Sequence, residues 1–151
     1  MQVFFAKDIH KLKKKSNSTI FLGGIKLKNQ EYQIIAHSDG DLIIHALTSC
    51  ILACVGSQTL GEIFPDYDNE NKNKSSLFFL AYALTALKKQ NKKINNIDIT
   101  IVCEQILLKD YHNLIINKIT ELTNCKNVSI KSTRFENKRN KYIECNCLIT
   151  I

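Results

Sequence analysis

The chain has 151 residues, 44% hydrophobic and 23% charged, which is typical of a single soluble domain spanning residues 1–151. No apolar run approaches the roughly 20 residues that a membrane-spanning helix needs, so we expect no membrane partner. The net charge of +7 fits a solvated, lysine-rich surface or an anionic small molecule carrying phosphate. The basic run from Lys11 to Lys15 lacks interleaved aromatic residues, so no specific nucleic-acid partner is expected.

The six cysteines form no Cys-x-x-Cys pair. Cys50 and Cys54 lie one helical turn apart in an apolar run, and Cys145 and Cys147 share one face of a predicted strand. No signal peptide is apparent, so we expect reduced, buried thiols in a cytoplasmic bacterial protein. A plastid-type organelle is the alternative location if a presequence was removed.

The first third of the chain alternates between strand and loop patterns. Residues 2–10 read as a strand, residues 11–19 as a polar loop, and residues 20–27 as a strand or hairpin with a Gly-Gly turn. The spacing then predicts a helix from about residue 38 to 54, with Ser38 at its N-cap. This helix is apolar on most of its circumference, so we expect it to be central and buried.

The rest of the chain predicts an α+β fold, a sheet with helices packed on one face. The opposite sheet face, which we expect to be rich in Ile and Cys, has no helix left to cover it, so neighbouring subunits are a reasonable cover. The expected elements are a long connection at 56–74, helices at 77–89 and 110–123, and strands at 96–103, 128–133 and 142–151.

Asp8, His10 and His45 are candidate metal ligands. Asp8 and His10 project from the same face of a strand, because side chains two apart in a strand do so. Two histidines and one carboxylate are a known set for a divalent metal that keeps a position open for substrate. Spacing alone does not show that the strand and the helix meet, and a satisfied core histidine remains the alternative for His45.

The start of the long helix is a candidate anion site. His37 and Ser38 fall where the first helical N–H groups lack partners and the helix dipole is positive. Asp39 and Asp41 are read as first-turn acids that favour the same dipole.

Two further acidic positions have open interpretations. Asp66 and Asp68 follow Pro65, and this loop either binds sugar hydroxyls or a cation, or forms an Asx turn. Glu136, at a strand end among cations, either holds a second metal on a diphosphate or pairs with Arg134 or another neighbour.

Taken together in chain order, these motifs resemble the 2-C-methyl-D-erythritol 2,4-cyclodiphosphate synthase family, the cyclases of the non-mevalonate isoprenoid pathway. The resemblance covers nearly the whole chain at near-constant spacing. Its most specific element is the run His-Ser-Asp-Gly-Asp-x3-His-Ala-Leu. The motifs that carry it are Asp8-x-His10, Gly23-Gly24, Ala36 to Leu47, and Gly61-x2-Phe64-Pro65-Asp66-x-Asp68.

The resemblance implies a homotrimeric lyase with active sites between subunits. It implies conversion of 4-diphosphocytidyl-2-C-methyl-D-erythritol 2-phosphate to the 2,4-cyclodiphosphate by attack of the 2-phosphate on the β-phosphorus, with release of CMP. Zinc or a similar divalent metal would be held by Asp8, His10 and His45, and Mg²⁺ or Mn²⁺ would sit on the diphosphate near Glu136.

The same resemblance implies a set of site residues. His37 and Arg134 would act in catalysis, and the backbone from Cys103 to Lys109 would read cytosine. The implied substrate-binding residues are Asp8, His10, His37, Ser38, Thr59, Gly61, Phe64, Asp66, Asp68, Thr133, Arg134, Glu136 and Arg139.

The chain departs from the family pattern at its nucleotide end. Thr59 stands where the family has Asp, Arg134 replaces a phosphate-contacting Thr, and the loop after Glu136 is shortened, with Arg139 in place of the usual Arg. An alternative interpretation is therefore a trimeric zinc-binding homologue with lost or altered catalytic activity.

Overall fold

A five-stranded sheet forms the frame of the molecule in a computed structural model that describes residues 1–65, 74–137 and 141–151. The strand order is β2-β1-β5-β3-β4. Neighbouring strands are antiparallel except β3 and β4, which are parallel. The strands are β1 (Val3–Leu22), β2 (Ile25–Ile35), β3 (Asn96–Cys103), β4 (Val128–Thr133) and β5 (Tyr142–Thr150).

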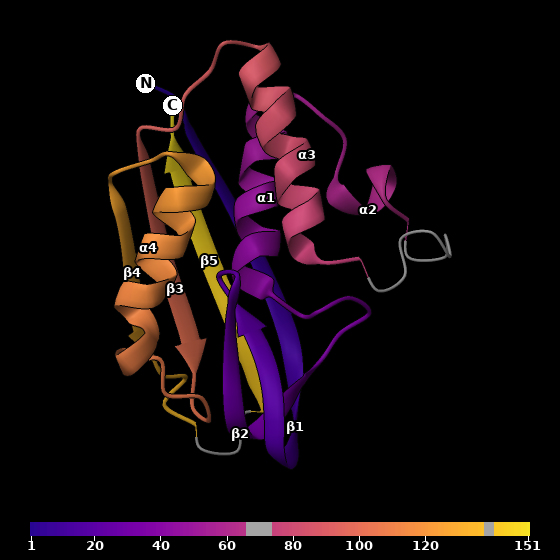
Figure 1. The fold of residues 1–151 in the computed structure, drawn as a ribbon, viewed down its shortest axis with the longest axis vertical. Helices are drawn as coiled ribbons and strands as arrows, with labels where there is room; N and C mark the ends of the chain where they lie inside the picture. Colours follow the sequence, from indigo (N-terminus) through magenta and orange to yellow (C-terminus); the bar gives the residue numbers. More distant parts are fainter. Residues whose placement is uncertain (66–73, 138–140) are drawn as a thin grey trace.

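The helices cover one face of this sheet, which confirms the predicted α+β fold (Figure 1). Helix α1 packs on β1 and β5, α4 packs on β4, and α3 packs against α1. Within the described residues every helix is too short or too polar to cross a bilayer. The helices are α1 (Leu42–Cys54), α2 (Leu60–Ile63), α3 (Ser76–Lys89), the 3-10 turn η1 (Lys109–Tyr111) and α4 (His112–Thr123).

Strict alternation along the strands divides the two sheet faces. Ile97, Ile99 and Ile101 of β3 are fully buried, as are Cys145 and Cys147 of β5. These side chains form the core with α1, so the Ile- and Cys-rich face is the one that the helices cover. The expectation that this face would be the uncovered one was wrong, because the strands place their largest aliphatic side chains toward the helices.

The uncovered face carries a mixture of polar and apolar side chains. Asp98 accepts hydrogen bonds from Lys131 Nζ at 2.6 and 2.7 Å, on neighbouring strands β3 and β4. The first strand adds exposed Val3, Phe5 and Ile9 to the same face. This surface therefore has apolar groups at its β1 side and ion pairs at its β4 side.

Strand β1 runs without a break through the stretch predicted to be a loop at 11–19. Its first half, up to Lys11, pairs with β5, and its second half pairs with β2. The register shifts between Lys14 and Ser18, where Asn17 has a φ of 57°. The side chains of residues 13–17 are all exposed, so this arm of the hairpin is held by backbone pairing and has no apolar alternation that a sequence pattern would reveal.

Helix α1 begins four residues later than predicted. Gly40 has a φ of 73°, a left-handed conformation that a right-handed helix excludes, so the helix starts at Leu42. Asp41 is the N-cap and its carboxylate accepts the N–H of Ile44 at 3.1 Å. The prediction that Ser38 caps this helix was wrong.

Candidate functional site

Asp8, His10 and His45 converge in the folded chain. Asp8 and His10 project from β1 toward the helices, and α1 packs across β1 with His45 in its first turn. His10 Nε2 lies 3.2 Å and His45 Nδ1 lies 3.7 Å from Asp8 Oδ2. One ligand atom from each of the three residues lies within 4.8 Å of the other two.

The donor atoms of this cluster fit a metal. Asp8 Oδ2 and His10 Nε2 are buried and have no hydrogen-bond partner among the described residues. Burial raises the pKa of Asp8, but the neighbouring His10 and His45 outweigh it and bring that pKa below its usual value. An ionised carboxylate beside two imidazoles, with buried donor atoms that lack a hydrogen bond, is a set that could bind a divalent cation.

The His45 ring is held on two further sides. Ser38 Oγ lies 3.4 Å from Nε2, the ring nitrogen that faces away from Asp8. The edge of the Phe79 ring packs against the imidazole, with ring centroids 6.0 Å apart and planes at 71°. The sequence motifs do not imply the Phe79 contact, because Phe79 belongs to α3, a separate segment.

Asp39 and Asp41, the two acids of the His-Ser-Asp-Gly-Asp run, bond to the starts of two different helices. Asp41 is 1% exposed, and it accepts N–H groups from Gly23 at 2.8 Å and Gly24 at 2.7 Å in addition to Ile44. Asp39 accepts the N–H of Ser76 at 2.8 Å, at the start of α3. Both acids precede α1, so their prediction as its first-turn residues was wrong.

The helix start itself is not an open anion site. The N–H groups of Leu42, Ile44 and His45 are bonded to Gly40 O, Asp41 Oδ1 and Asp41 O. The premise that unpaired helical N–H groups point outward beside His37 and Ser38 was therefore wrong. His37 is exposed and Ser38 is half-buried, so either side chain would have to contact an anion directly.

The segment after α1 holds three of the predicted substrate residues. Thr59 donates its N–H and hydroxyl to the Glu62 carboxylate at 2.8 and 2.6 Å, which caps the short α2. Gly61 is exposed within α2. Phe64 stacks against Phe79 with ring centroids 4.9 Å apart, which connects this segment to the aromatic contact of His45. Asp66 and Asp68 lie outside the described residues.

The residues predicted for the nucleotide end lie at the far side of the sheet. Thr133 and Arg134 are exposed at the end of β4, and Glu136 is exposed with a φ of 58°. Arg139 lies outside the described residues. Thr133 pairs with Val102, and β5 links that row to Ile9 on β1, so three strand spacings, about 14 Å, separate Thr133 from the Asp8–His10 strand. One subunit does not bring these residues to the metal cluster.

The cytosine-reading segment predicted at 103–109 follows β3. Ile106 and Leu108 are buried and anchor it to the core. Glu104 Oε1 is buried without a hydrogen-bond partner among the described residues. Apolar contacts thus hold this segment in place, and the Glu104 carboxylate could accept a hydrogen bond.

Sequence reasoning missed the supporting residues Ser76 and Phe79. Ser75 is the N-cap of α3, and the following Ser76 is bonded to Asp39. A serine beside an N-cap and a phenylalanine in an apolar helix carry no signal of these roles in the sequence. The Asp-Gly-Asp spacing around Gly40 carries a signal, since a left-handed glycine there places the helix start after it, which makes Asp41 the N-cap of α1 and leaves Asp39 outside that helix.

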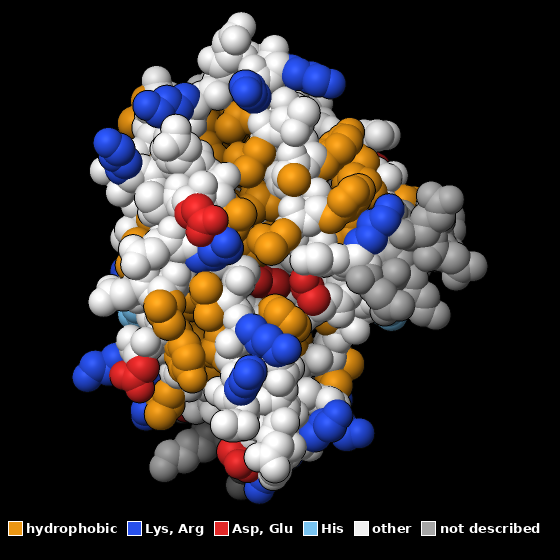
Figure 2. All heavy atoms as spheres, in the orientation of Figure 1, with side chains coloured by type: hydrophobic (Ala, Val, Ile, Leu, Met, Phe, Trp, Pro, Cys, Tyr) orange, Lys and Arg blue, Asp and Glu red, His pale blue; other side chains and the backbone are white. Residues whose placement is uncertain are grey.

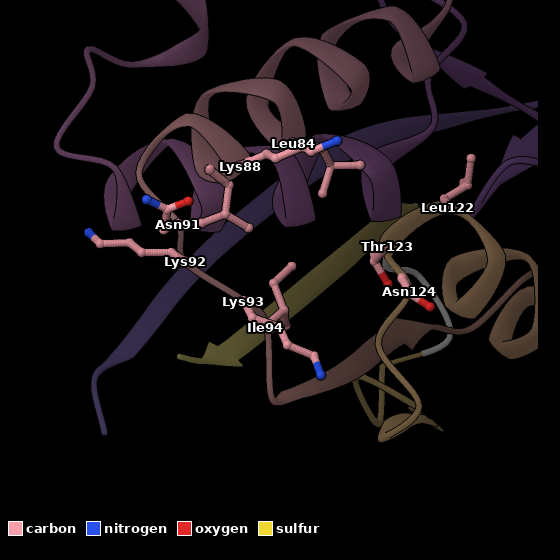
Figure 3. Close-up of a pocket in the computed structure, with 10 residues that line it drawn as sticks. Leu84, Lys88, Asn91, Lys92, Lys93, Ile94, Leu122, Thr123 and Asn124 are labelled. Atoms are coloured by element: carbon pink, nitrogen blue, oxygen red, sulfur yellow. The ribbon is translucent and has the colours of Figure 1, made fainter.

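A separate hollow of about 540 Å³ lies at the other end of α3 (Figure 3). It is lined by Leu84, Leu87 and Ile94 with Lys88 and Lys93 at its rim, and none of the predicted site residues borders it. On the face drawn in Figure 2, the Lys and Arg side chains of the described residues are dispersed and form no single stripe.

The fold and the cluster define an α+β protein with two histidines and one carboxylate that could bind a metal. The YgbB family profile matches residues 1–151, so this chain belongs to the YgbB family. Curated relatives of the chain carry the name 2-C-methyl-D-erythritol 2,4-cyclodiphosphate synthase, which confirms the expected family.

Two relatives illustrate the likeness. A synthase of that name from Mycoplasmoides gallisepticum is 37% identical over 142 residues, which cover 94% of this chain and 90% of the relative. An apicoplast synthase from Plasmodium falciparum is 36% identical over 136 residues; the match covers 86% of this chain but 56% of that longer protein.

Solved structures show the same fold. A CDP complex of IspF from Plasmodium falciparum aligns with a TM-score of 0.82 at 31% identity, covering 97% of this chain and 92% of that one. A CDP-bound 2C-methyl-D-erythritol-2,4-cyclodiphosphate synthase aligns with a TM-score of 0.89 over 99% of both chains, at 20% identity, which supports the fold alone.

Proposed function

We propose that this protein is a 2-C-methyl-D-erythritol 2,4-cyclodiphosphate synthase, a phosphorus-oxygen lyase of isoprenoid biosynthesis. The observation that carries the proposal is the meeting of Asp8, His10 and His45 within 4.8 Å. It occurs in a chain of which 94% aligns with a synthase of that name at 37% identity. Family membership gives the reaction, and the cluster supplies a site at which it can be carried out.

The substrate is 4-diphosphocytidyl-2-C-methyl-D-erythritol 2-phosphate. An oxygen of the 2-phosphate forms a bond to the β-phosphorus, and the bond from that phosphorus to the bridging oxygen of the diphosphate breaks. The bridging oxygen leaves with CMP, and the two remaining phosphates form the cyclic diphosphate. No water is consumed, so the protein's task is to bring two anionic phosphates together and to neutralise them.

The proposed resident metal is zinc or a similar divalent ion, held by Asp8, His10 and His45. Bound there, it would supply Lewis-acid polarisation of a phosphate oxygen. A second ion, Mg²⁺ or Mn²⁺, is proposed on the diphosphate, with Glu136 as its protein ligand. The single exposed Glu136 carboxylate is too small a donor set to hold such an ion alone, so the substrate phosphates would complete it.

The chain's own side chains are proposed to divide the substrate between them. His37 and Arg134 would neutralise phosphate charge, with Ser38 and Thr133 as hydroxyl donors. The methylerythritol portion would contact Thr59, Gly61 and the segment from Phe64 to Asp68. The backbone from Cys103 to Lys109 would read cytosine, and Arg139 would face the diphosphate.

A homotrimer is proposed because the site is incomplete within one chain. Thr133 stands about 14 Å across the sheet from the metal-binding strand, so Thr133 and Arg134 of one subunit would serve the cluster of another. Exposed Phe5 and Ile9 on the sheet face without helices offer an apolar surface for that contact. The proposed location is the cytoplasm of a bacterium or a plastid-type organelle.

The deciding experiment measures CMP release from the cytidyl substrate by the zinc-loaded protein with Mg²⁺ present. We expect stoichiometric CMP and cyclic diphosphate, and loss of both after metal removal by a chelator. No CMP from a zinc-loaded trimer would contradict the proposal and favour a metal-binding homologue without this activity. The Glu121→Gln variant, changed at an exposed position of α4 that pairs with Lys118, provides a control that should keep the activity.

A further inference from the structure

The Asp39 carboxylate is the hydrogen-bond partner of the buried Ser76 hydroxyl. Ser76 is 0% exposed, and a buried hydroxyl needs a hydrogen-bond partner. Its hydroxyl and its N–H both donate to the Asp39 carboxylate, the N–H at 2.8 Å, and the Ser75 hydroxyl adds a third bond at 3.3 Å. Asp39 also accepts the N–H of Asp41 at 3.1 Å. One carboxylate therefore joins the loop before α1 to the first turn of α3.

Both segments that Asp39 joins carry a contact to His45. Ser38, the residue before Asp39, places its hydroxyl 3.4 Å from His45 Nε2. Phe79 lies one helical turn after Ser76 and so on the same face of α3, where its ring meets the imidazole edge-on at 6.0 Å. Loosening Asp39 from Ser76 would release both contacts at once.

The Ser38 contact fixes which edge of the His45 ring faces Asp8. Ser38 Oγ lies beside Nε2 and accepts the N–H of Gly40 at 3.5 Å, so the hydroxyl is tied to its own loop. Nδ1, on the other edge of the ring, lies 3.7 Å from Asp8 Oδ2. Loss of the Ser38 contact would let the ring turn away from Asp8.

We propose that Asp39 is a positioning residue for His45, the proposed metal ligand, and that it acts through Ser38 and Phe79 to fix the orientation of the imidazole ring. This inference rests on the metal site of the proposed function. It assigns Asp39 to support of the ligand rather than to contact with substrate. Partners of this kind typically change metal affinity by about 10- to 100-fold when they are removed.

The test compares zinc affinity of the full-length wild type with Asp39→Asn and Ser38→Ala, by competition with a chelator. An Asn amide would place a donor against the Ser76 N–H, so we expect zinc to bind about 10- to 100-fold more weakly. The Co²⁺-loaded variant should also show a changed visible absorption spectrum, which reports ligand geometry. Ser38→Ala removes only one hydroxyl, so it tests the same link if Asp39→Asn does not fold.

Two controls separate the outcomes. Ile119→Val alters the core beneath α4 without touching His45, and it should keep the wild-type zinc affinity and Co²⁺ spectrum even if it unfolds earlier. Wild-type zinc affinity and spectrum in both Asp39→Asn and Ser38→Ala, alongside loss of zinc in His10→Ala, would overturn this inference alone. Failure of the wild type to bind zinc would overturn it together with the metal site, whereas CMP release is scored separately and decides the proposed reaction.

Discussion

His45 Nδ1 lies 3.7 Å from Asp8 Oδ2, which brings the first turn of α1 against the strand that begins the chain. The contact exists because α1, apolar on nearly all sides, packs across β1 and β5. Its half-buried imidazole thus faces a carboxylate whose Oδ2 has no hydrogen-bond partner among the described residues. The packing of α1 on β1 therefore also brings His45 to Asp8 and His10.

Replacing His45 with Ala should remove the metal and leave the fold. The variant loses one of three ligands, so we expect zinc affinity to fall by more than about 100-fold, beyond the loss typical of supporting residues. Lewis-acid stabilisation is worth several kcal/mol, so turnover should fall about 1,000-fold or more. Zinc content by elemental analysis and CMP release measure the two effects. Stoichiometric zinc in a folded His45→Ala protein would show that the ligand assignment is wrong.

The proposed trimer can be tested by changing one exposed apolar side chain, Phe5. Phe5 is 62% exposed on the sheet face that no helix covers, and Phe5→Glu would place an unpaired charge in the proposed subunit contact. We expect sedimentation to report a monomer for this variant at micromolar concentration and a trimer for the wild type. Leu114→Glu is the matched control, because Leu114 is 53% exposed on α4 at the opposite face. Equal masses for Phe5→Glu and the wild type would exclude this surface as the contact.

The elements that the sequence predicted best are those with one buried face. Strand β3 was predicted at its observed bounds, 96–103, because isoleucine alternates there with polar residues. Strand β4 likewise matches its prediction at 128–133. The arm of β1 at 11–19 was missed because the side chains of residues 13–17 are exposed on both faces, so no period distinguishes this run from a loop.

The sequence identified the candidate ligand residues, but it did not show that they meet in space. Asp8 and His10 follow from strand alternation, yet their meeting with His45 depends on how α1 crosses the sheet, which only the family resemblance implied. The start of α1 was misjudged because Ser38 and Asp41 are both good N-cap residues, and the left-handed Gly40 between them decides in favour of Asp41.

The Gly23–Gly24 turn should tolerate no side chain at its first position. Gly23 has a φ of 62°, and a methyl group there would overlap Cγ2 of the buried Ile115. A left-handed alanine and an overpacked contact together should lower the free energy of unfolding by about 2–4 kcal/mol. Denaturant unfolding of Gly23→Ala measures this loss.

The Gly61→Ala variant tests whether Gly61 contributes to substrate binding or to the stability of the fold. A methyl group at Gly61 would meet nothing within 4 Å, so stability should change by less than about 0.5 kcal/mol. A rise in KM for the cytidyl substrate at unchanged stability would support the proposed contact of Gly61 with substrate. Unchanged kinetics would remove Gly61 from the proposed binding set.

Asp41 gives the fold a pH dependence opposite in sign to that of an ordinary salt-bridged acid. Burial raises its pKa to about 6 from 3.8, although the N–H groups of Gly24, Ile44 and Gly23 lower it. Between these two values the native state binds more protons than the unfolded chain, so the Asp41 contribution to stability falls as pH rises from about 4 to about 6. A shift of about two units corresponds to a loss of about 3 kcal/mol.

Asp41→Asn should remove that dependence, because an amide stays neutral and resembles the protonated acid. Denaturant titrations at pH 4, 5, 6 and 7 give the unfolding free energies of the wild type and of Asp41→Asn. As pH rises, the unfolding free energy of the wild type should therefore fall relative to that of Asp41→Asn. The Glu62→Gln variant is a control of opposite sign. In the wild type, hydrogen bonds from Thr59 lower the pKa of Glu62, so the stability that these bonds give is lost as pH falls. A wild-type advantage over Asp41→Asn that grows from pH 4 to pH 7 would mean that the three N–H bonds outweigh burial and that Asp41 is ionised throughout.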